Sequence, residues 1–344
     1  MTIRIGIVGA GKMGISHYAI ANATEGASVV AVCDTSRYVL SVLRKQAGVA
    51  TYRSLDDLLA GSAPDAVIVA TPTSTHAECA RLAMARGCHV FVEKPLTLSA
   101  RESEALARLA AERGLVDQVG FHNRFIGTFR EARRLVAAGA LGQVTTVHGS
   151  AFGQVVVKEE GSTWRSRRTE GGGCLHDYAC HVVDLMNFIV GAPSRVAGAR
   201  MRRIFSREVE DAVHALLDYD DGKTGVLETN WSDETVRKMS TTVRVEGTHG
   251  KLLVDRQELR VFLRAGCAVD GYPEGWSTRY ITALQAPVAF YLRGEEYSAQ
   301  LEAFVAAIRR GGRGHENSFE SAARTDRVLE EIAAASQAGP GGGR

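Results

Sequence analysis

The sequence lacks a long apolar run and lacks a marked excess of charge of either sign. A membrane-spanning helix needs roughly 20 mostly apolar residues in succession, and no segment of the 344-residue sequence provides them. The formal net charge is only +2, which argues against a general nucleic-acid binder because such proteins usually carry a strongly basic surface. The amino terminus shows no charged segment followed by an apolar one, the pattern of a signal peptide. We therefore expect a cytoplasmic protein with no membrane or nucleic-acid partner.

Paired cysteines are also missing. None of the six cysteines belongs to a Cys-x-x-Cys pair, and a chain of this length can bury sizeable cores without disulfides. Apolar residues make up 45% and charged residues 23% of the sequence, which is ordinary for a globular protein. We expect reduced thiols and two domains.

The first 122 residues alternate between short apolar segments and amphipathic helical segments. The predicted strands are residues 3–8, 29–33, 66–70, 89–92 and 116–119. Apolar strands that alternate with helices are typical of a parallel sheet covered on both faces. The fold class is therefore α/β, with residues 1–122 forming a doubly wound Rossmann domain, in which ligands bind beyond the carboxyl ends of the strands.

Residues 123–338 show a different pattern, which predicts an α+β domain with an open, mainly antiparallel sheet. The predicted strands are residues 144–150, 214–219, 225–229, 241–246 and 251–254, and the predicted helices are residues 175–190, 297–310 and 318–336. The glycine-rich tail, residues 339–344, is expected to be disordered.

A glycine-rich loop follows the first predicted strand and leads into a helix. Its sequence is Gly9-Ala10-Gly11-Lys12-Met13-Gly14. In this context the glycines permit a tight turn and a close approach of a pyrophosphate, which the amides of the helix N-terminus would bind. Gly9, Gly11, Lys12, Met13 and Gly14 are therefore predicted to bind a dinucleotide.

Asp34 and its neighbours bear on the choice of dinucleotide. Asp34 lies 20 residues after Gly14, at the end of the second predicted strand, where a carboxylate would bind the ribose hydroxyls. Its charge would repel a 2′-phosphate, so NAD is favoured over NADP. Thr35 and Arg37 follow in the same binding region, and Arg37 leaves NADP open because its guanidinium could reach a phosphate.

Two further motifs suggest the chemistry. Glu93-Lys94-Pro95 ends the fourth predicted strand, so the Lys94 ammonium is placed at the cofactor edge of the sheet. Asp177 and His181 are four residues apart in a predicted helix, so both should project from one face. A carboxylate beside an imidazole orients it and raises its basicity, which suits removal of a hydroxyl proton.

Taken together, these motifs resemble the glucose–fructose oxidoreductase / inositol dehydrogenase / MocA family over nearly the whole chain. The segments that carry the resemblance are the Gly9–Gly14 loop, Thr71-Pro72 with His76, Glu93-Lys94-Pro95, Gly120 with Arg124, and Asp177-x-x-x-His181 followed by Asp184. The family implies NAD(P) as cofactor and a homodimer or homotetramer built through the second domain's sheet. It also implies Lys94, Asp177 and His181 as the catalytic group, and Thr71, Pro72, His76, Glu93 and Lys94 as cofactor contacts.

The substrate is predicted less sharply. Lys94, Asp177 and His181 should contact it, together with Arg124, Trp164 and Arg165. Residues 154–169 should form a loop near the site, by analogy with the family. Its arginines, Arg165, Arg167 and Arg168, would suit a phosphate or carboxylate, whereas Glu159, Glu160 and Glu170 would suit an amino sugar. These charges could equally be solvated.

The sequence thus predicts an NAD-dependent dehydrogenase that moves a hydride between nicotinamide and a secondary hydroxyl or ketone. The substrate would be a sugar, an amino sugar or a cyclitol. The Ala-, Gly- and Arg-rich composition would suit a GC-rich bacterial genome, and the resemblance to family members that oxidise or reduce sugars of antibiotic pathways implies an aminoglycoside as one such substrate. The alternatives are a non-catalytic sensor of NAD and sugar, and a dihydrodiol-dehydrogenase-like reductase of a non-sugar substrate. No metal is expected, because His176, Cys180 and His181 lack an evident fourth ligand and hydride transfer to NAD needs none.

Overall fold

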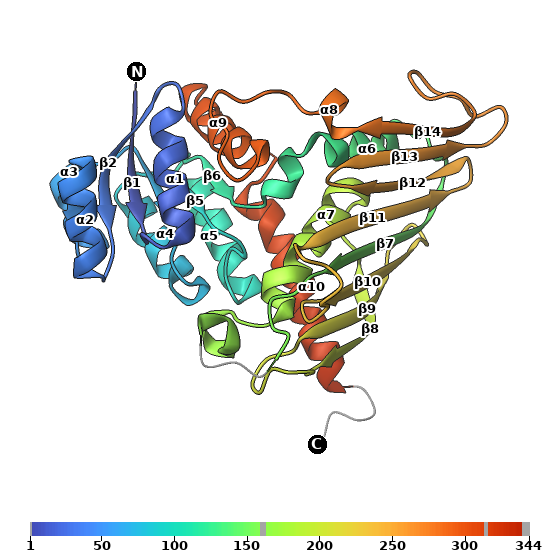
Figure 1. Ribbon diagram of the computed structural model, residues 1–344, viewed down its shortest axis with the longest axis horizontal. Coiled ribbons are helices and arrows are strands. Elements are labelled where there is room, and N and C mark those ends of the chain that lie inside the picture. The colour runs from blue at the N-terminus through green and yellow to red at the C-terminus, as the bar shows by residue number, and fades with distance from the viewer. Residues whose placement is uncertain (1, 159–162, 313–315, 339–344) are drawn as a thin grey trace. The chain divides into compact units, whose positions relative to one another are not determined.

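The computed structural model describes residues 2–158, 163–312 and 316–338, and the chain forms two compact units (Figure 1). Unit 1 contains Met1–His122 and Pro287–Ala323, and unit 2 contains Asn123–Ala286 and Arg324–Arg344. The predicted disordered tail, residues 339–344, lies outside the described residues. No described helix is both long and apolar enough to cross a membrane.

Unit 1 is built on a six-stranded sheet in the order β3-β2-β1-β4-β5-β6, and every neighbouring pair is parallel. The strands are β1 (Ile3–Val8), β2 (Ala27–Cys33), β3 (Ala50–Tyr52), β4 (Ala66–Val69), β5 (His89–Val92) and β6 (Asp117–Val119). The helices are α1 (Lys12–Ala23), α2 (Arg37–Ala47), α3 (Leu55–Ser62), α4 (His76–Ala85), α5 (Ala100–Glu112) and α9 (Glu295–Arg309). The Rossmann prediction is confirmed.

The central strands show why the parallel sheet could be predicted. All four residues of β4 are fully buried, as expected for a strand covered by helices on both faces. The edge strand β3 was not predicted, because it has three residues and is partly exposed. Parallel strands place all their carboxyl ends at one edge, so the segments after β1, β2, β4 and β5 meet there.

Helix α9 belongs to unit 1, which differs from the predicted domain ranges 1–122 and 123–338. Its Leu301 and Phe304 are buried in one apolar cluster with Ile5 and Phe91, and the Phe304 and Phe91 rings meet edge to face at 5.9 Å. This burial of apolar surface joins a late segment of the chain to the first domain. The predicted second domain, residues 123–338 in one stretch, is corrected accordingly, because Pro287–Ala323 belong to unit 1.

Unit 2 contains an eight-stranded sheet in the order β14-β13-β12-β11-β7-β10-β9-β8. Its strands are β7 (Val144–Phe152), β8 (Arg195–Arg202), β9 (Ala212–Asp218), β10 (Thr224–Asn230), β11 (Ser240–Gly247), β12 (Gly250–Asp255), β13 (Glu258–Leu263) and β14 (Gly275–Tyr280). Only the central pair, β7 and β10, is parallel among these neighbours. The mainly antiparallel sheet is confirmed, although β8, β13 and β14 were not predicted.

Helices cover one face of this sheet (Figure 1). They are α6 (Gly127–Ala137), α7 (Cys180–Val190) and most of α10 (Phe319–Ala338), with the short α8 (Ile281–Leu284) at the end of β14. Side chains along β10 and β11 alternate between buried and more exposed, the period of a sheet with one covered face. The opposite face is open.

Candidate functional site

The glycine-rich loop after β1 has a shape that only glycine permits at its two ends. Gly9 has φ +92°, and a Cβ atom there would lie 2.6 Å from the carbonyl oxygen of Ala70. A Cβ atom on Gly14 would overlap the carbonyl of Gly9. Gly11 differs, because a Cβ atom there would meet nothing within 4 Å. The loop is therefore tightly packed at both ends and open in the middle.

Helix α1 begins directly after this opening, with Gly11 as its N-cap and no side chain capping it. The first amides of an uncapped helix have no partner inside the helix and favour an anion. A pyrophosphate would fit here, because the open space lies at Gly11 and Lys12 adds a positive charge. The residues present therefore fit a dinucleotide.

Asp34 is held by two backbone amides at the end of β2. Its Oδ2 atom accepts from the Ala10 amide at 2.6 Å, and its Oδ1 atom accepts from the Ser36 amide at 2.7 Å. The carboxylate is thus fixed beside the glycine loop. Thr35 and Arg37 are exposed, and Arg37 is the first residue of α2. The predicted contacts of all three with the cofactor remain predictions.

His76 links the segment after β4 to the segment after β5. Its Nδ1 atom lies 3.0 Å from the Pro95 carbonyl oxygen and its Nε2 atom lies 3.0 Å from the Thr71 carbonyl oxygen. Burial lowers the pKa of His76 although both carbonyls raise it. A neutral imidazole has one N–H, so it donates to one carbonyl at a time. These contacts give His76 a structural role, while cofactor contact by His76, Thr71 and Pro72 stays a prediction.

Glu93, the first residue after β5, contacts His17, the Lys94 amide and Gly120. Its Oε1 atom lies 2.7 Å from Nε2 of His17, and its Oε2 atom accepts from the Lys94 amide at 3.2 Å. A Cβ atom on Gly120 would lie 3.0 Å from Glu93 Oε2, so glycine leaves room for the carboxylate. His17 was not predicted, although a histidine three residues after Gly14 in the same helix was the available signal.

In unit 2, Asp177 lies in a π-helix rather than in the predicted α-helix. The π-helix is Leu175–Ala179, and α7 with His181 follows from Cys180. A π-helix contains more residues per turn than an α-helix and is often found at functional sites, so the predicted α-helical spacing of Asp177 and His181 is corrected. Both side chains come from one continuous buried segment, with exposed fractions of 9% and 4%.

An arginine from the preceding loop bonds to Asp177 and stacks on a neighbouring tryptophan. Arg165 Nε donates to Asp177 Oδ2 at 3.0 Å, and the Arg165 guanidinium stacks 4.5 Å from the Trp164 ring centre. Trp164 is 37% exposed. The structure therefore brings together three residues that the sequence assigned to substrate binding.

Arg124 has a different environment. It lies in the 3₁₀ turn His122–Phe125 and is only 3% exposed. Its Nε donates to Asp184 Oδ2 at 2.8 Å and its Nη2 to Asp184 Oδ1 at 2.5 Å. Such a buried bidentate pair fixes the orientation of both side chains. The predicted substrate contact of Arg124 is not tested by these contacts and remains a prediction.

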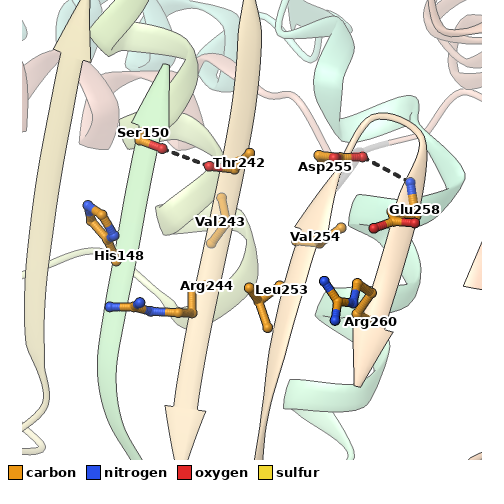
Figure 2. A pocket seen from close by; sticks show the side chains of 10 residues that line it. All are labelled: His148, Ser150, Thr242, Val243, Arg244, Leu253, Val254, Asp255, Glu258 and Arg260. Atoms are coloured by element: carbon orange, nitrogen blue, oxygen red, sulfur yellow. Dashed lines mark hydrogen bonds between the residues drawn. The ribbon is translucent and has the colours of Figure 1, made fainter. Parts of the chain in front are cut away.

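A shallow hollow of about 310 Å³ lies elsewhere, on the open face of the unit 2 sheet (Figure 2). His148, Arg244 and Arg260 face it from β7, β11 and β13, and Ser150 is hydrogen-bonded to Thr242 at 2.7 Å. It contains none of the predicted site residues. No described group of three or more His, Cys, Asp or Glu residues is arranged to hold a metal ion.

Two family models match the chain. The model described as "Oxidoreductase family, NAD-binding Rossmann fold" matches residues 3–121, and the GFO/IDH/MocA C-terminal domain model matches residues 129–253. The chain therefore belongs to the GFO/IDH/MocA family of oxidoreductases, and its first unit contains an NAD-binding Rossmann domain. The resemblance seen in the sequence motifs is confirmed.

Individual relatives agree with this assignment. The scyllo-inositol 2-dehydrogenase (NAD(+)) of Bacillus subtilis (strain 168) is 26% identical over 319 residues, which cover 90% of this chain and 87% of the relative. Levoglucosan dehydrogenase in complex with NADH is similar in fold, with a TM-score of 0.86, 22% identity, and coverage of 98% of this chain and 97% of that one. GenD2 from gentamicin A biosynthesis, in complex with NAD, gives a TM-score of 0.80 and 28% identity, and covers 98% of this chain and 95% of that one.

Proposed function

We propose that this protein is an NAD-dependent dehydrogenase of a secondary hydroxyl, or in reverse a ketone, on a neutral sugar or cyclitol. The observation that carries the proposal is the buried segment with Asp177 and His181, in a chain whose other unit has an intact dinucleotide loop and Lys94. A sensor without turnover would have no need for this acid–base group. The similarity to scyllo-inositol 2-dehydrogenase supports the substrate class.

Each residue of the group has a distinct role in this proposal. His181 removes the hydroxyl proton as general base, since an imidazole titrates near neutral pH. The Lys94 ammonium stabilises the negative charge that develops on the substrate oxygen. Asp177 orients the group and accepts a hydrogen bond from a neighbouring hydroxyl. Bound NAD⁺ supplies the hydride acceptor at its nicotinamide ring.

The preference for a neutral substrate rests on the charges of the loop before the π-helix. Arg165 is bound to Asp177, and Arg167 Nη1 lies 2.8 Å from Glu170 Oε1. Arg168 Nη2 lies 3.9 Å from Glu210 Oε2. Each of the three arginines that would suit a phosphate thus already has a carboxylate nearby, and Glu170, which would suit an amino sugar, already has Arg167 nearby. Glu159 and Glu160 lie outside the described residues.

Substrates that share a ring and differ in charge test this proposal. Formation of NADH would be followed with scyllo-inositol, glucose, glucose phosphate and glucosamine. The neutral compounds should give a kcat/KM at least about tenfold above their charged counterparts, the factor that corresponds to 1.4 kcal/mol. Faster turnover of glucosamine or of the phosphate would contradict the neutral class. NADH binding without turnover of any sugar or cyclitol tested would favour the sensor instead.

The similarity to GenD2 favours a second candidate, a hydroxyl of an amino sugar in an antibiotic pathway. In that case Asp177 or Glu170 would exchange its arginine for the substrate's ammonium group. An aminoglycoside precursor added to the same assay distinguishes this candidate from the neutral sugar.

A further inference from the structure

Two adjacent carboxylates, Glu210 and Asp211, support the π-helix that contains Asp177, Glu210 by direct contact and Asp211 through Trp231. They immediately precede β9 in the sequence, more than thirty residues after the π-helix. Glu210 is 5% exposed and Asp211 is fully buried. Neither residue was singled out by the sequence motifs, and neither has a role in the proposed chemistry.

Glu210 contacts the start of the π-helix. Its Oε1 atom accepts from the Leu175 amide at 2.9 Å, and its backbone carbonyl accepts from the Cys174 amide at 2.9 Å. Gly173 has φ +105°, and a Cβ atom there would overlap the Glu210 carboxylate. The glycine run therefore permits the close approach that lets Glu210 reach Leu175.

Asp211 supports the other end through a tryptophan. Its Oδ1 atom accepts from the Trp231 indole N–H at 2.6 Å, and the fully buried Trp231 ring meets the Tyr178 ring edge to face at 6.5 Å. Asp211 also accepts from the Ile204, Phe205 and Ser206 amides. Tyr178 follows Asp177 directly, so Asp177 stands in the sequence between the two supported residues, Leu175 and Tyr178.

We propose that Glu210 is a positioning residue, whose hydrogen bond to the Leu175 amide sets the π-helical turn and thereby places Asp177 and His181. The reach of the side chain matters more than its charge, because the donor is a neutral amide that any well-placed oxygen accepts. Its ion pair with Arg168 is 3.9 Å long and that arginine side chain is 57% exposed, so the ion pair contributes little. This inference rests on the proposed roles of Asp177 and His181.

Two substitutions in the full-length protein separate reach from charge. Glu210→Gln keeps an oxygen at the same distance and removes the charge. Glu210→Asp keeps the charge and withdraws the oxygen by about 1.5 Å, one carbon–carbon bond. Glu208→Gln and Glu208→Asp are the matched controls, because Glu208 is exposed two residues away. Both Glu210 variants leave a polar group in place, so both are expected to fold.

Two measurements follow. Hydrogen exchange of the amides of residues 174–180 needs no substrate and should become faster in Glu210→Asp, while Glu210→Gln and both controls resemble the wild type. With NAD⁺ and scyllo-inositol, or the best compound of the substrate panel, Glu210→Asp should lower kcat on the order of 10- to 100-fold, as a misplacement near 1 Å does. NADH binding and KM should change little. The midpoint of the pH profile should shift in the same variant that loses kcat.

The outcomes separate the two proposals. Unchanged exchange in Glu210→Asp would overturn the positioning role, and equal losses in Glu210→Gln and Glu210→Asp would overturn the claim that reach decides. Faster exchange combined with normal kcat and an unshifted pH profile would overturn the catalytic roles of Asp177 and His181, not the effect of Glu210 on the turn.

Discussion

Nε2 of His17 lies 2.7 Å from Oε1 of Glu93, and the His17 side chain is completely buried. Burial alone would raise the pKa of the Glu93 carboxyl, but the hydrogen bond and charge of His17, with the charge of Lys94, lower that pKa below its usual value. The ionised carboxylate next to Lys94 is therefore maintained by a residue of helix α1. This links helix α1, which follows the glycine-rich loop, to the Glu93-Lys94-Pro95 turn within unit 1.

The first prediction concerns His17→Leu, which should destabilise the protein by about 3 kcal/mol at pH 7, because removing one partner of a buried pair leaves an uncompensated charge. The wild-type pair contributes stability above the ordinary carboxyl pKa, and that stability is lost as the pH falls through the lowered pKa of folded Glu93. In the leucine variant the hydrogen bond and charge of His17 no longer oppose desolvation, although the charge of Lys94 remains, so the Glu93 carboxyl should be protonated more readily than in the wild type.

The difference in the free energy of unfolding between wild type and His17→Leu should therefore shrink as the pH falls toward about 4, near the ordinary pKa of a glutamate. Urea unfolding at several pH values measures it. Glu93→Gln is the control, since it removes the charge that would otherwise be left unpaired. A difference that stays constant down to pH 4 would show that the loss comes from packing of the imidazole on Phe91, with which it makes an edge contact at 5.1 Å.

A second prediction is that NADH binds more tightly than NADPH. The Asp34 carboxylate is fixed by the Ala10 and Ser36 amides, so its negative charge cannot easily move away from a 2′-phosphate. Asp34→Ser should reduce the ratio of the NADPH and NADH dissociation constants by about tenfold or more, the effect of 1.4 kcal/mol. Fluorescence titration with both cofactors measures it, and equal affinities in the wild type would instead assign Arg37 as a phosphate ligand.

The features that the sequence predicted correctly depend on local chemistry. The Gly9 and Gly14 positions can be read from the sequence because a tight turn and close helix packing admit no side chain there. The apolar strands β1, β4 and β5 are predictable because burial on both faces leaves no polar position. The position of Lys94 after β5 was predicted in the same way, whereas its role stays a prediction.

The features that were missed depend on contacts between distant segments. The apolar face of α9 could pack on any core, and its burial with Ile5 and Phe91 places it in unit 1. The π-helix at Asp177 has no local signature, because Glu210 and Trp231, which contact it, come from much later in the chain. Strand β8 contains three arginines and a glycine in eight residues, so its composition hides the strand.

A third prediction concerns Lys94→Ala, which should lower kcat on the order of 100-fold or more, as the loss of a group that stabilises a developing oxyanion does. The lysine acts on charge that appears only during the reaction, so NADH affinity should stay within a few-fold of the wild type. Steady-state kinetics and NADH titration measure the two quantities. Retention of more than about a tenth of the rate would contradict the assigned role.

The open face of the unit 2 sheet gives a fourth prediction, that copies of this chain associate through it. Trp276 is 50% and Leu216 45% exposed, and the Trp276 ring packs at 5.4 Å on Phe262 of the neighbouring strand. Exposed apolar side chains on a sheet face are typical of an interface. Trp276→Glu with Leu216→Glu should yield monomers in light scattering after gel filtration. Tyr38→Glu, at an exposed aromatic residue of unit 1, is the control and should leave the oligomer intact.

The final prediction concerns the proton. If His181 is the general base, the kcat/KM for alcohol oxidation should rise with pH through a single ionisation, since only the neutral imidazole accepts the hydroxyl proton. His181→Asn should remove that ionisation and most of the rate. Asp177→Asn should move the midpoint to lower pH, because a nearby carboxylate favours the imidazolium form. Arg165→Ala offers the opposite change, since it removes the cation bound to Asp177 and should move the midpoint to higher pH. If His181→Asn kept the wild-type profile at a near-normal rate, the proton would leave by another route, with Lys94 as the first candidate, and the role of His181 would be wrong although the family assignment would stand.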